Sequence, residues 1–443
     1  MNKIEEELKN KFKNDDTFCC YDIKENNGII IKLYYLLGLV DNDKIGEIVL
    51  KQIERYKVTN TYLSVTEANN YNIEAVVEKI INGEVIVFDY KDNIIKAIDV
   101  KKHFLRSVSE PDNEKIVKGP KEGFIENVIT NINLIRTRIR SNSLKFEFVQ
   151  EQNPKVVVAY LDDKVDKKIL NNVKSKLNRM ILENNNINNI KELLKEQKYN
   201  LFNTVGDTGR VDICTYKLLE GKMIILLDGS PLVLYLPYLF DENFQTIDDY
   251  YLSYSFASLN RTLRFLSFII SILLPGLYVA LLKFHQELMP VELTLSIAAS
   301  RKGVPFSTFF ECTLLLTAFE ILREAGTKIS SLLGSSLSIV GGLVIGQATV
   351  EARMISTSVV IIVAMSSITT LINSKLSGPI IIMRYMILFM GALIGMYGIL
   401  ICSLFFSMML VKMKSFGNYY ISDIFPFSFK KYRKTYMRLP NEK

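Results

Sequence analysis

Apolar residues gather in the C-terminal part of the chain, in runs without a charged residue. Four runs cover 265–282, 329–350, 354–374 and 385–411. Each can form a membrane-spanning helix, because a hydrocarbon core of roughly 30 Å needs about 20 apolar residues. A buried helix of a globular protein rarely needs 27 uncharged residues, the length of the last run. The pattern therefore predicts an α-helical multi-pass membrane domain over 261–411.

The segment 284–328 departs from this pattern, because charged residues interrupt its apolar stretches. Its longest uncharged run, 312–319, is too short to cross a bilayer. We expect interfacial or re-entrant helices on the outer side, broken at 303–305 and ended at Gly326. Crossing here would require charges buried inside an oligomer. We assign gating or subunit contacts to Arg301, Glu311, Glu320, Arg323 and Glu324.

The first half of the chain alternates short β-type runs with segments of helical period. Residues 33–56 resemble 158–180, and 81–100 resemble 219–237. Each member of the second pair has a Gly turn, an alternating strand and a second strand after an Asp-containing hairpin. We interpret this half as an α/β cytoplasmic region of two related subdomains. Coincidence of α/β patterning is the alternative to duplication.

The expected boundaries follow from these repeats and from the Pro/Gly-rich connection at 109–123. An N-terminal α/β subdomain covers 1–141 and includes a basic connecting helix at 124–141; the second subdomain covers 142–260. Arg136, Arg138 and Arg140 on that helix fit an anion site, a solvated face or a salt bridge between subdomains.

Charge is distributed unevenly and indicates an orientation. Residues 1–250 carry 36 basic and 39 acidic side chains, and 251–443 carry 18 and 8. The excess positive charge flanks apolar runs, so nucleic acid is a poor explanation. Arg261 and Arg264 precede the first run, and a basic tail over 412–443 follows the last. The positive-inside rule then places both termini in the cytoplasm, with an even number of crossings.

Motifs for catalysis or cofactor binding are missing from the sequence. There is no GxxxxGK[ST] and no GxGxxG after a strand. The two histidines, His103 and His285, are far apart, and the five cysteines are scattered without a CxxC. "GDTGR" at 206–210 and "LDGSP" at 227–231 read as turns. We therefore expect no enzyme activity, no metal and no cofactor, and a reducing compartment for the first half.

One apolar run carries small residues four positions apart, beginning at Ser330, and then two polar residues with the same spacing. Small side chains let helix backbones approach closely, and polar groups beside them usually face a bundle interior or water. A ring of Glu351 carboxylates at the inner mouth of a pore could filter cations. The alternative is that Glu351 and Arg353 pair in a turn. The candidate pore or packing residues are Gly334, Ser338, Gly342, Gly346, Gln347 and Glu351.

Several long segments resemble the A subunit of GerA-type spore germinant receptors. These segments are 106–141, 226–237, 273–290, 290–306, 319–329 and 338–352. The resemblance covers nearly the whole chain. It departs from the family at Ser307, where a proline is usual, and at Pro379, which comes later than the family's proline. These differences concern local geometry around 307 and 370–380.

The resemblance implies a receptor in the spore inner membrane of endospore-forming bacteria. Its partners would be a transporter-like B subunit and a lipoprotein C subunit, with nutrient binding mainly on the B subunit. A subunits of this family are thought to form a ring, a homo-oligomer that acts as a ligand-gated ion conduit. The α/β region and both termini would lie on the cytoplasmic, or core, side. The alternatives are a non-conducting scaffold, or an A-subunit-like protein of sporulation membranes outside the nutrient receptors.

Overall fold

The structure is a computed structural model of the whole chain. It describes residues 2–25, 28–41, 43–46, 66–67, 73–90, 94–101, 114, 119–150, 155–178, 186–196, 200–246, 248–328, 341–342 and 344–421. The chain forms two compact units. One comprises Met1–Lys198, Asn203–Tyr238 and Ser415–Gly417; the other comprises Tyr199–Phe202, Leu239–Lys414 and Asn418–Lys443. We call them the α/β unit and the helical unit.

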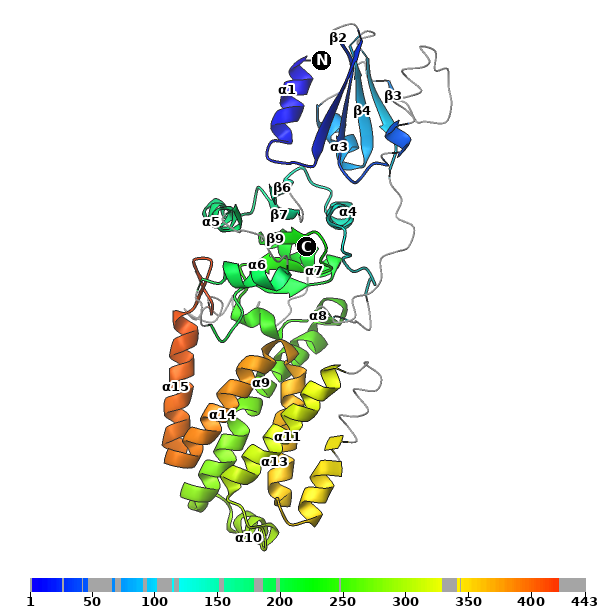
Figure 1. Cartoon of the computed structure of the whole chain (residues 1–443). Helices are drawn as coiled ribbons and strands as arrows, with labels where there is room; N and C mark the ends of the chain where they lie inside the picture. Colours follow the sequence, from blue (N-terminus) through cyan, green and yellow to red (C-terminus); the bar gives the residue numbers. More distant parts are fainter. Residues whose placement is uncertain are drawn as a thin grey trace. The chain divides into compact units, whose positions relative to one another are not determined.

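The first part of the α/β unit is an antiparallel sheet with two helices on one face (Figure 1). Its strands, in spatial order, are β1 (Phe18–Glu25), β2 (Gly28–Leu36), β4 (Glu84–Asp89), β5 (Ile94–Asp99) and β3 (Thr66–Glu67). The helices are α1 (Asn2–Lys11) and α3 (Ile73–Ile81). Side chains alternate along β4, so Ile86 and Phe88 join the helix-covered core while Val85 and Val87 face the other side.

The second part repeats the strand order of the first sheet, but helices cover both faces of its sheet. Its sheet has the order β6 (Leu144–Gln150), β7 (Val156–Leu161), β9 (Met223–Leu227), β10 (Val233–Leu236) and β8 (Gly206–Thr208). Its helices are α4 (Val128–Arg138), α5 (Lys167–Asn178), α6 (Ile187–Leu194) and α7 (Val211–Leu219). In the first sheet α1 precedes β1 and α3 precedes β4, the third strand in space. In the second sheet α4 precedes β6 and α7 precedes β9, again the third strand in space. This matching order is what the sequence repeat predicts.

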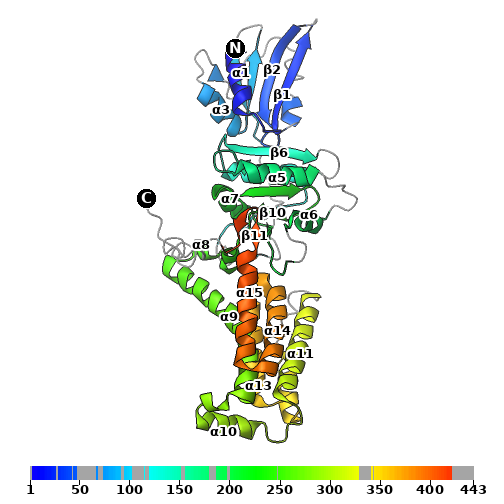
Figure 2. The ribbon, with the colours of Figure 1, turned by 90° about the vertical axis from the view of Figure 1, so that its left-hand side faces the viewer.

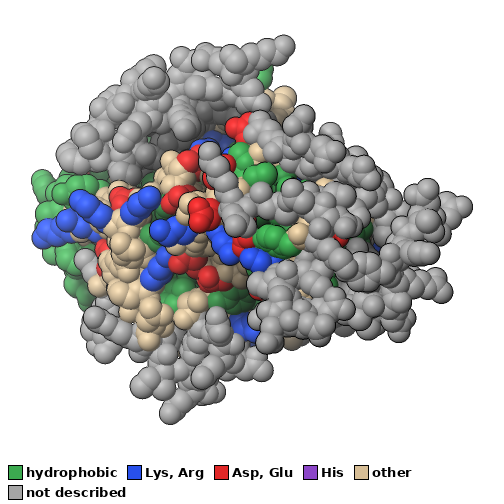
Figure 3. Space-filling model, turned by 90° about the horizontal axis from the view of Figure 1, so that it is seen from above, with side chains coloured by type: hydrophobic (Ala, Val, Ile, Leu, Met, Phe, Trp, Pro, Cys, Tyr) green, Lys and Arg blue, Asp and Glu red, His purple; other side chains and the backbone are tan. Residues whose placement is uncertain are grey.

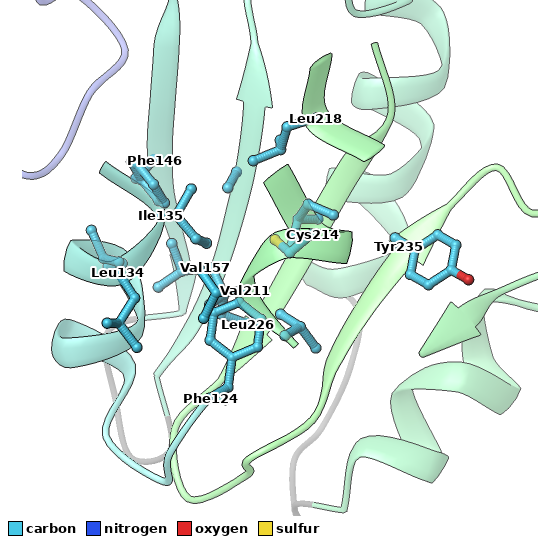
Figure 4. Packing of buried hydrophobic residues seen from close by; sticks show 14 of the residues in the cluster. Phe124, Leu134, Ile135, Phe146, Val157, Val211, Cys214, Leu218, Leu226 and Tyr235 are labelled. Carbon is cyan, nitrogen blue, oxygen red and sulfur yellow. The ribbon is translucent and has the colours of Figure 1, made fainter. Parts of the chain in front are cut away.

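Helix α4 belongs to the second sheet. Val128, Ile132 and Ile135 are buried against Phe146 and Val157 of the strands, as Figure 4 shows for the labelled members of this core. The subdomain boundary therefore lies before α4, not after residue 141 as the sequence suggested. The physical reason is that the apolar face of this helix is buried by β6 and β7, which follow it in the chain.

The helical unit begins with η1 (Phe240–Phe244), α8 (Asp248–Tyr251) and the long helix α9 (Tyr254–Phe284). The elements that follow are η2 (Gln286–Leu288), α10 (Val291–Ser300), α11 (Thr308–Lys328), helical residues at 344–351, α13 (Thr357–Ile372), η3 (Ser374–Leu376), α14 (Ser377–Ile394) and α15 (Met396–Lys412). A short hairpin, β11 (Lys414–Ser415) and β12 (Asn418–Tyr419), comes next. The long helices lie side by side in a bundle (Figures 1 and 2).

The run 385–411, expected as one span, is two helices. Gly395 has φ +70 and separates α14 from α15, which turns back along α14. A Cβ at Gly395 would lie 3.0 Å from Cδ2 of Phe284, so both the backbone conformation and the close approach favour glycine. Hydropathy cannot show this turn, because all residues around it are apolar.

The segment 284–328 also differs from the expectation. Its first part contains only the short helices η2 and α10, with a turn at 301–307 where Gly303 has φ +89. From Thr308, however, α11 continues for 21 residues through Gly326 and packs beside α13. The charged residues of α11 are accommodated by ion pairs, which a count of uncharged residues does not anticipate.

Two helices among the described residues are long and apolar enough to span a membrane. They are Tyr254–Phe284 and Ser374–Ile394, judged by length and composition. Thr357–Ile372 and Met396–Lys412 are apolar but shorter. The expected span at 329–350 lies mainly outside the described residues.

Candidate functional site in the helical unit

The interior of the helical unit contains a fully buried arginine. Arg384, on α14, is 0% exposed and pairs with Glu320 of α11. It also donates to the hydroxyls of Ser366 and Thr370 on α13, at 3.2 and 3.3 Å. One cation thus ties three helices together. Sequence reasoning missed it, because Arg384 stands immediately before an uncharged run and was treated as its border.

Glu320 has a second basic partner. Its other carboxylate oxygen accepts a hydrogen bond from Nε of Arg323 at 2.8 Å, one turn along α11. Glu324 lies on an exposed face and pairs with Lys328. Of these predicted contact residues, Glu320 and Arg323 are therefore brought together with Arg384, whereas Glu324 is separate from this cluster.

A second ion pair lies at the N-terminal end of α11. Glu311 is 0% exposed and binds Arg301 through one oxygen at 3.2 Å. The other oxygen accepts from the backbone N–H and the hydroxyl of Ser356, both at 2.8 Å. Ser356 precedes α13, so Glu311 joins the start of α11 to the start of α13 and to the turn after α10. A buried carboxylate needs such partners to remain charged.

The small residues described at 341–346 pack against helices of the same chain. A Cβ at Gly342 would lie 3.2 Å from the ring of Phe319 on α11, and one at Gly346 would lie 3.6 Å from Val360 on α13. Close packing of helices is the simpler of the two roles that the sequence suggested. Ser330, Gly334 and Ser338 lie outside the described residues.

Glu351 is exposed and accepts a hydrogen bond from the Gln347 side chain at 2.9 Å. The turn that follows it lies near Gly303, where a Cβ would be 3.5 Å from Cδ of Arg353. Arg353 itself has φ +52.

The structure corrects the expected position of this turn. Ser356, at the start of α13, contacts Glu311, whereas Asn373, at the end of α13, donates to the carbonyl of Arg264 at 3.1 Å. Glu351 therefore lies at the end of the bundle opposite Arg261 and Arg264, not on their side. The expectation failed because it counted 329–350 as the second passage, whereas α11 already runs back along α9.

Arg261 and Arg264 share a buried acidic partner that the sequence analysis did not notice. Asp249 is 0% exposed and pairs with Arg261 at 3.0 Å and with Arg264 at 2.8 Å. The orientation inferred from the sequence uses these two arginines as basic flanks of the first apolar run. Their charge is partly compensated, since one carboxylate binds both.

The basic helix of the α/β unit holds its two sheets together. Arg136 is 3% exposed and pairs with Asp15, which precedes β1, and with the hydroxyl of Thr17. Lys145, whose pKa burial lowers, donates to the carbonyl of Lys11 at 2.7 Å. For Arg136 the salt bridge between subdomains is therefore the correct alternative. Arg138 pairs with Glu122 on the surface.

The described residues hold no group of three or more His, Cys, Asp or Glu side chains that could bind a metal ion. Burial raises the pKa of the Cys214 thiol, which lies in the second core and is therefore a poor nucleophile. The "GDTGR" segment forms β8 and the start of α7, where Arg210 is fully buried and pairs with Asp212. On the face shown in Figure 3, basic and acidic side chains are interspersed where residues are described.

These features define a class of protein: an α/β unit with two sheets of the same strand order, joined to a bundle of apolar helices whose buried charges are paired inside. The family model "Bacillus/Clostridium GerA spore germination protein" matches residues 5–443. The chain belongs to this family, the GerA spore germination proteins.

Individual proteins are similar to this chain over most of its length. Spore germination protein KA of Bacillus subtilis (strain 168) is 33% identical over 94% of this chain and 80% of that protein. Spore germination protein A1 of the same organism is 32% identical over 94% and 88%. Its uncharacterized membrane protein YfkQ is 31% identical over 94% and 84%.

One solved structure is similar in sequence at a lower level. The N-terminal domain of the A subunit of the Bacillus megaterium spore germinant receptor GerK3 is 20% identical and covers 53% of this chain and 94% of that domain. The TM-score of this similarity is 0.37.

Proposed function

We propose that this chain is an A-type subunit of a spore germinant receptor whose helical unit lies in the membrane. As a homo-oligomer it forms or gates a path for ions that triggers germination when a nutrient is sensed. Its proposed partners are a transporter-like B subunit and a lipoprotein C subunit. The α/β unit and both termini lie on the core side of the spore inner membrane, and the chain is not an enzyme.

The observation that carries this proposal is the inverted polarity of the helical unit. Arg384 and Glu311 are 0% exposed, whereas large apolar side chains of α13 and α15 face outward. In water, both the buried charges and the exposed apolar side chains would be unfavourable. In a bilayer, charges inside and apolar side chains outside are expected. The outward apolar residues of α15 include Leu400, Ile401, Leu404, Phe405 and Met408.

An ion path needs polar groups at its entrance, and Glu351 is an exposed carboxylate at one end of the bundle. Copies of the chain around an axis would place several such carboxylates in a ring, which attracts cations. Because Glu351 lies opposite Arg261 and Arg264, the proposed ring is at the mouth away from the core side. Gln347 holds the carboxylate by its hydrogen bond.

Two alternatives keep the same membrane placement. The chain could serve as a scaffold that anchors other subunits and conducts nothing. It could also act as an A-subunit-like protein of the sporulation membrane outside the nutrient receptors.

The test is cation flux from liposomes that contain the full chain, alone and with its partner subunits. Glu351→Gln removes the charge and keeps the size of the side chain. We expect a lower cation flux and a weaker preference for cations over anions. Glu287→Gln is the matched control, since Glu287 is an exposed carboxylate just after the end of α9.

Flux that is the same in rate and selectivity for wild type and Glu351→Gln would remove Glu351 from the conduit. Absence of flux in every combination of subunits would favour the scaffold.

A further inference from the structure

A cavity of about 510 Å³ opens in the helical unit between the last turns of α9 and α14 and the start of α11. Its wall has two chemically distinct parts. Lys283, Gln286 and Arg301 provide polar groups, and Phe309, Phe389 and Leu393 provide the apolar part. The described residues that line it include no carboxylate.

The polar part has hydrogen-bond donors to spare. An ammonium group has three N–H donors, and Lys283 donates to the carbonyl of Ala392 at 2.8 Å. Arg301 binds Glu311 through a terminal nitrogen, while its buried Nε makes no hydrogen bond to any described residue. Glu311 is absent from the residues that line the cavity, and its second oxygen accepts hydrogen bonds from Ser356. The polar wall is therefore cationic.

The apolar part continues the outer surface of the bundle. Phe389 is 53% exposed and Leu393 is 55% exposed, so both side chains lie partly in the cavity wall and partly on the outward face of α14. A molecule that enters here meets positive charge and apolar surface together. This combination suits an anionic group that carries an apolar chain, and a free inorganic anion would leave the apolar wall unused.

We propose that this cavity binds the phosphate headgroup of an anionic phospholipid. Lys283 and Arg301 donate to the phosphate, and Phe389 and Leu393 contact the first methylene groups of an acyl chain. Phosphate prefers such pairs of basic side chains, and basic pockets between membrane helices bind lipid headgroups. This site rests on the proposed membrane location of the helical unit.

The experiment is native mass spectrometry of the full-length protein in detergent with added phosphatidylglycerol or phosphatidylcholine. We expect wild type to retain phosphatidylglycerol preferentially. Lys283→Gln removes the charge but keeps a donor for the Ala392 carbonyl, so the fold should persist. Its retention of phosphatidylglycerol should fall roughly tenfold, the effect of losing one charge-assisted hydrogen bond, and Lys283→Arg should restore it.

Lys302→Gln is the matched control, because Lys302 is exposed, adjacent to Arg301 and absent from the cavity wall; its retention should equal that of wild type. Equal retention of the two lipids, or no change in Lys283→Gln, would overturn the proposal. So would competition by millimolar inorganic phosphate alone, which would identify a site for soluble anions. Ion conduction without a lipid preference would refute this lipid site and would still support the proposed function.

Discussion

At the scale of single residues, the protein is organised around buried charges that are paired. Arg384 with Glu320 and Arg136 with Asp15 each join segments far apart in the sequence. Glu311, paired with the nearby Arg301, reaches a distant segment through Ser356. A buried pair often contributes little net stability compared with an apolar substitute, but removing one partner leaves a charge without compensation. These residues therefore specify which helices and strands meet.

Replacing Glu320 tests this role in the helical unit. Glu320→Gln leaves Arg384 buried without its carboxylate, and the free energy of unfolding should fall by about 3 kcal/mol. The measurement is the thermal unfolding of the purified full-length protein in detergent. Glu324→Gln, one turn further along α11, breaks an exposed pair with Lys328 and should cost less than about 0.5 kcal/mol. Equal effects of the two changes would contradict the account.

Glu5 gives a prediction about pH. Burial favours a higher pKa for this carboxyl, but hydrogen bonds from Lys32, Lys9 and Tyr90 outweigh it and hold the pKa well below its usual range. The folded state therefore favours the ionised form. This stabilisation is fully present above the unfolded pKa of about 4.5 and is lost as pH falls toward the folded value.

We expect Glu5→Gln to lower the local stability of the first sheet by about 2 kcal/mol at pH 7. The difference from wild type should shrink as pH falls below 4.5. Hydrogen exchange of β1 and β2 amides in the full-length protein, corrected for intrinsic rates, measures both. Glu6→Gln on the exposed face of α1 is the control. A difference that grows on acidification would have the wrong sign.

At the scale of elements, sequence patterns predicted the features of the fold that neighbouring residues determine. They failed for features that depend on contacts with residues far away in the sequence. Two sheets with similar strand patterns were predictable, because strand alternation and Gly turns are encoded in short segments. The position of α4 was not, since its arginine-rich end suggested a solvated connector although Val128, Ile132 and Ile135 form a buried face. Helix α11 was not recognised as one long helix, because its charged residues interrupt the apolar pattern although they are held in ion pairs.

The hairpin at Gly395 is the sharpest of these differences and can be tested by labelling. In a protein whose five native cysteines are replaced by serine, Tyr397→Cys lies just after the turn, at the end of the bundle. We expect it to react with a membrane-impermeant maleimide added to the side away from the core, where the proposed topology places the turn at Gly395. Phe405→Cys, exposed at the middle of α15, should be protected by lipid.

A single helix over 385–411 would place residue 397 near the centre of the bilayer. Protection of Tyr397→Cys equal to that of Phe405→Cys would therefore restore the single span and refute the hairpin.

At the scale of the whole molecule, the family, the two sheets of the α/β unit and the inverted polarity of the helical unit agree with one proposal. A receptor subunit needs a part that responds to its partners and a part that changes the permeability of the membrane. The sequence indicated both parts and the family, whereas the arrangement of the helices and the position of Glu351 required the structure. An ion conduit would require several copies of the chain to assemble. Within one bundle the buried charges are already paired with each other.

The number of copies in the membrane tests this central claim most directly. The measurement is the mass of the complex formed by the full-length chain, extracted in its native lipids and determined by native mass spectrometry. The account predicts a closed ring of several identical chains, with or without the partner subunits. A chain that remains a monomer under these conditions would contradict a conduit built from its copies.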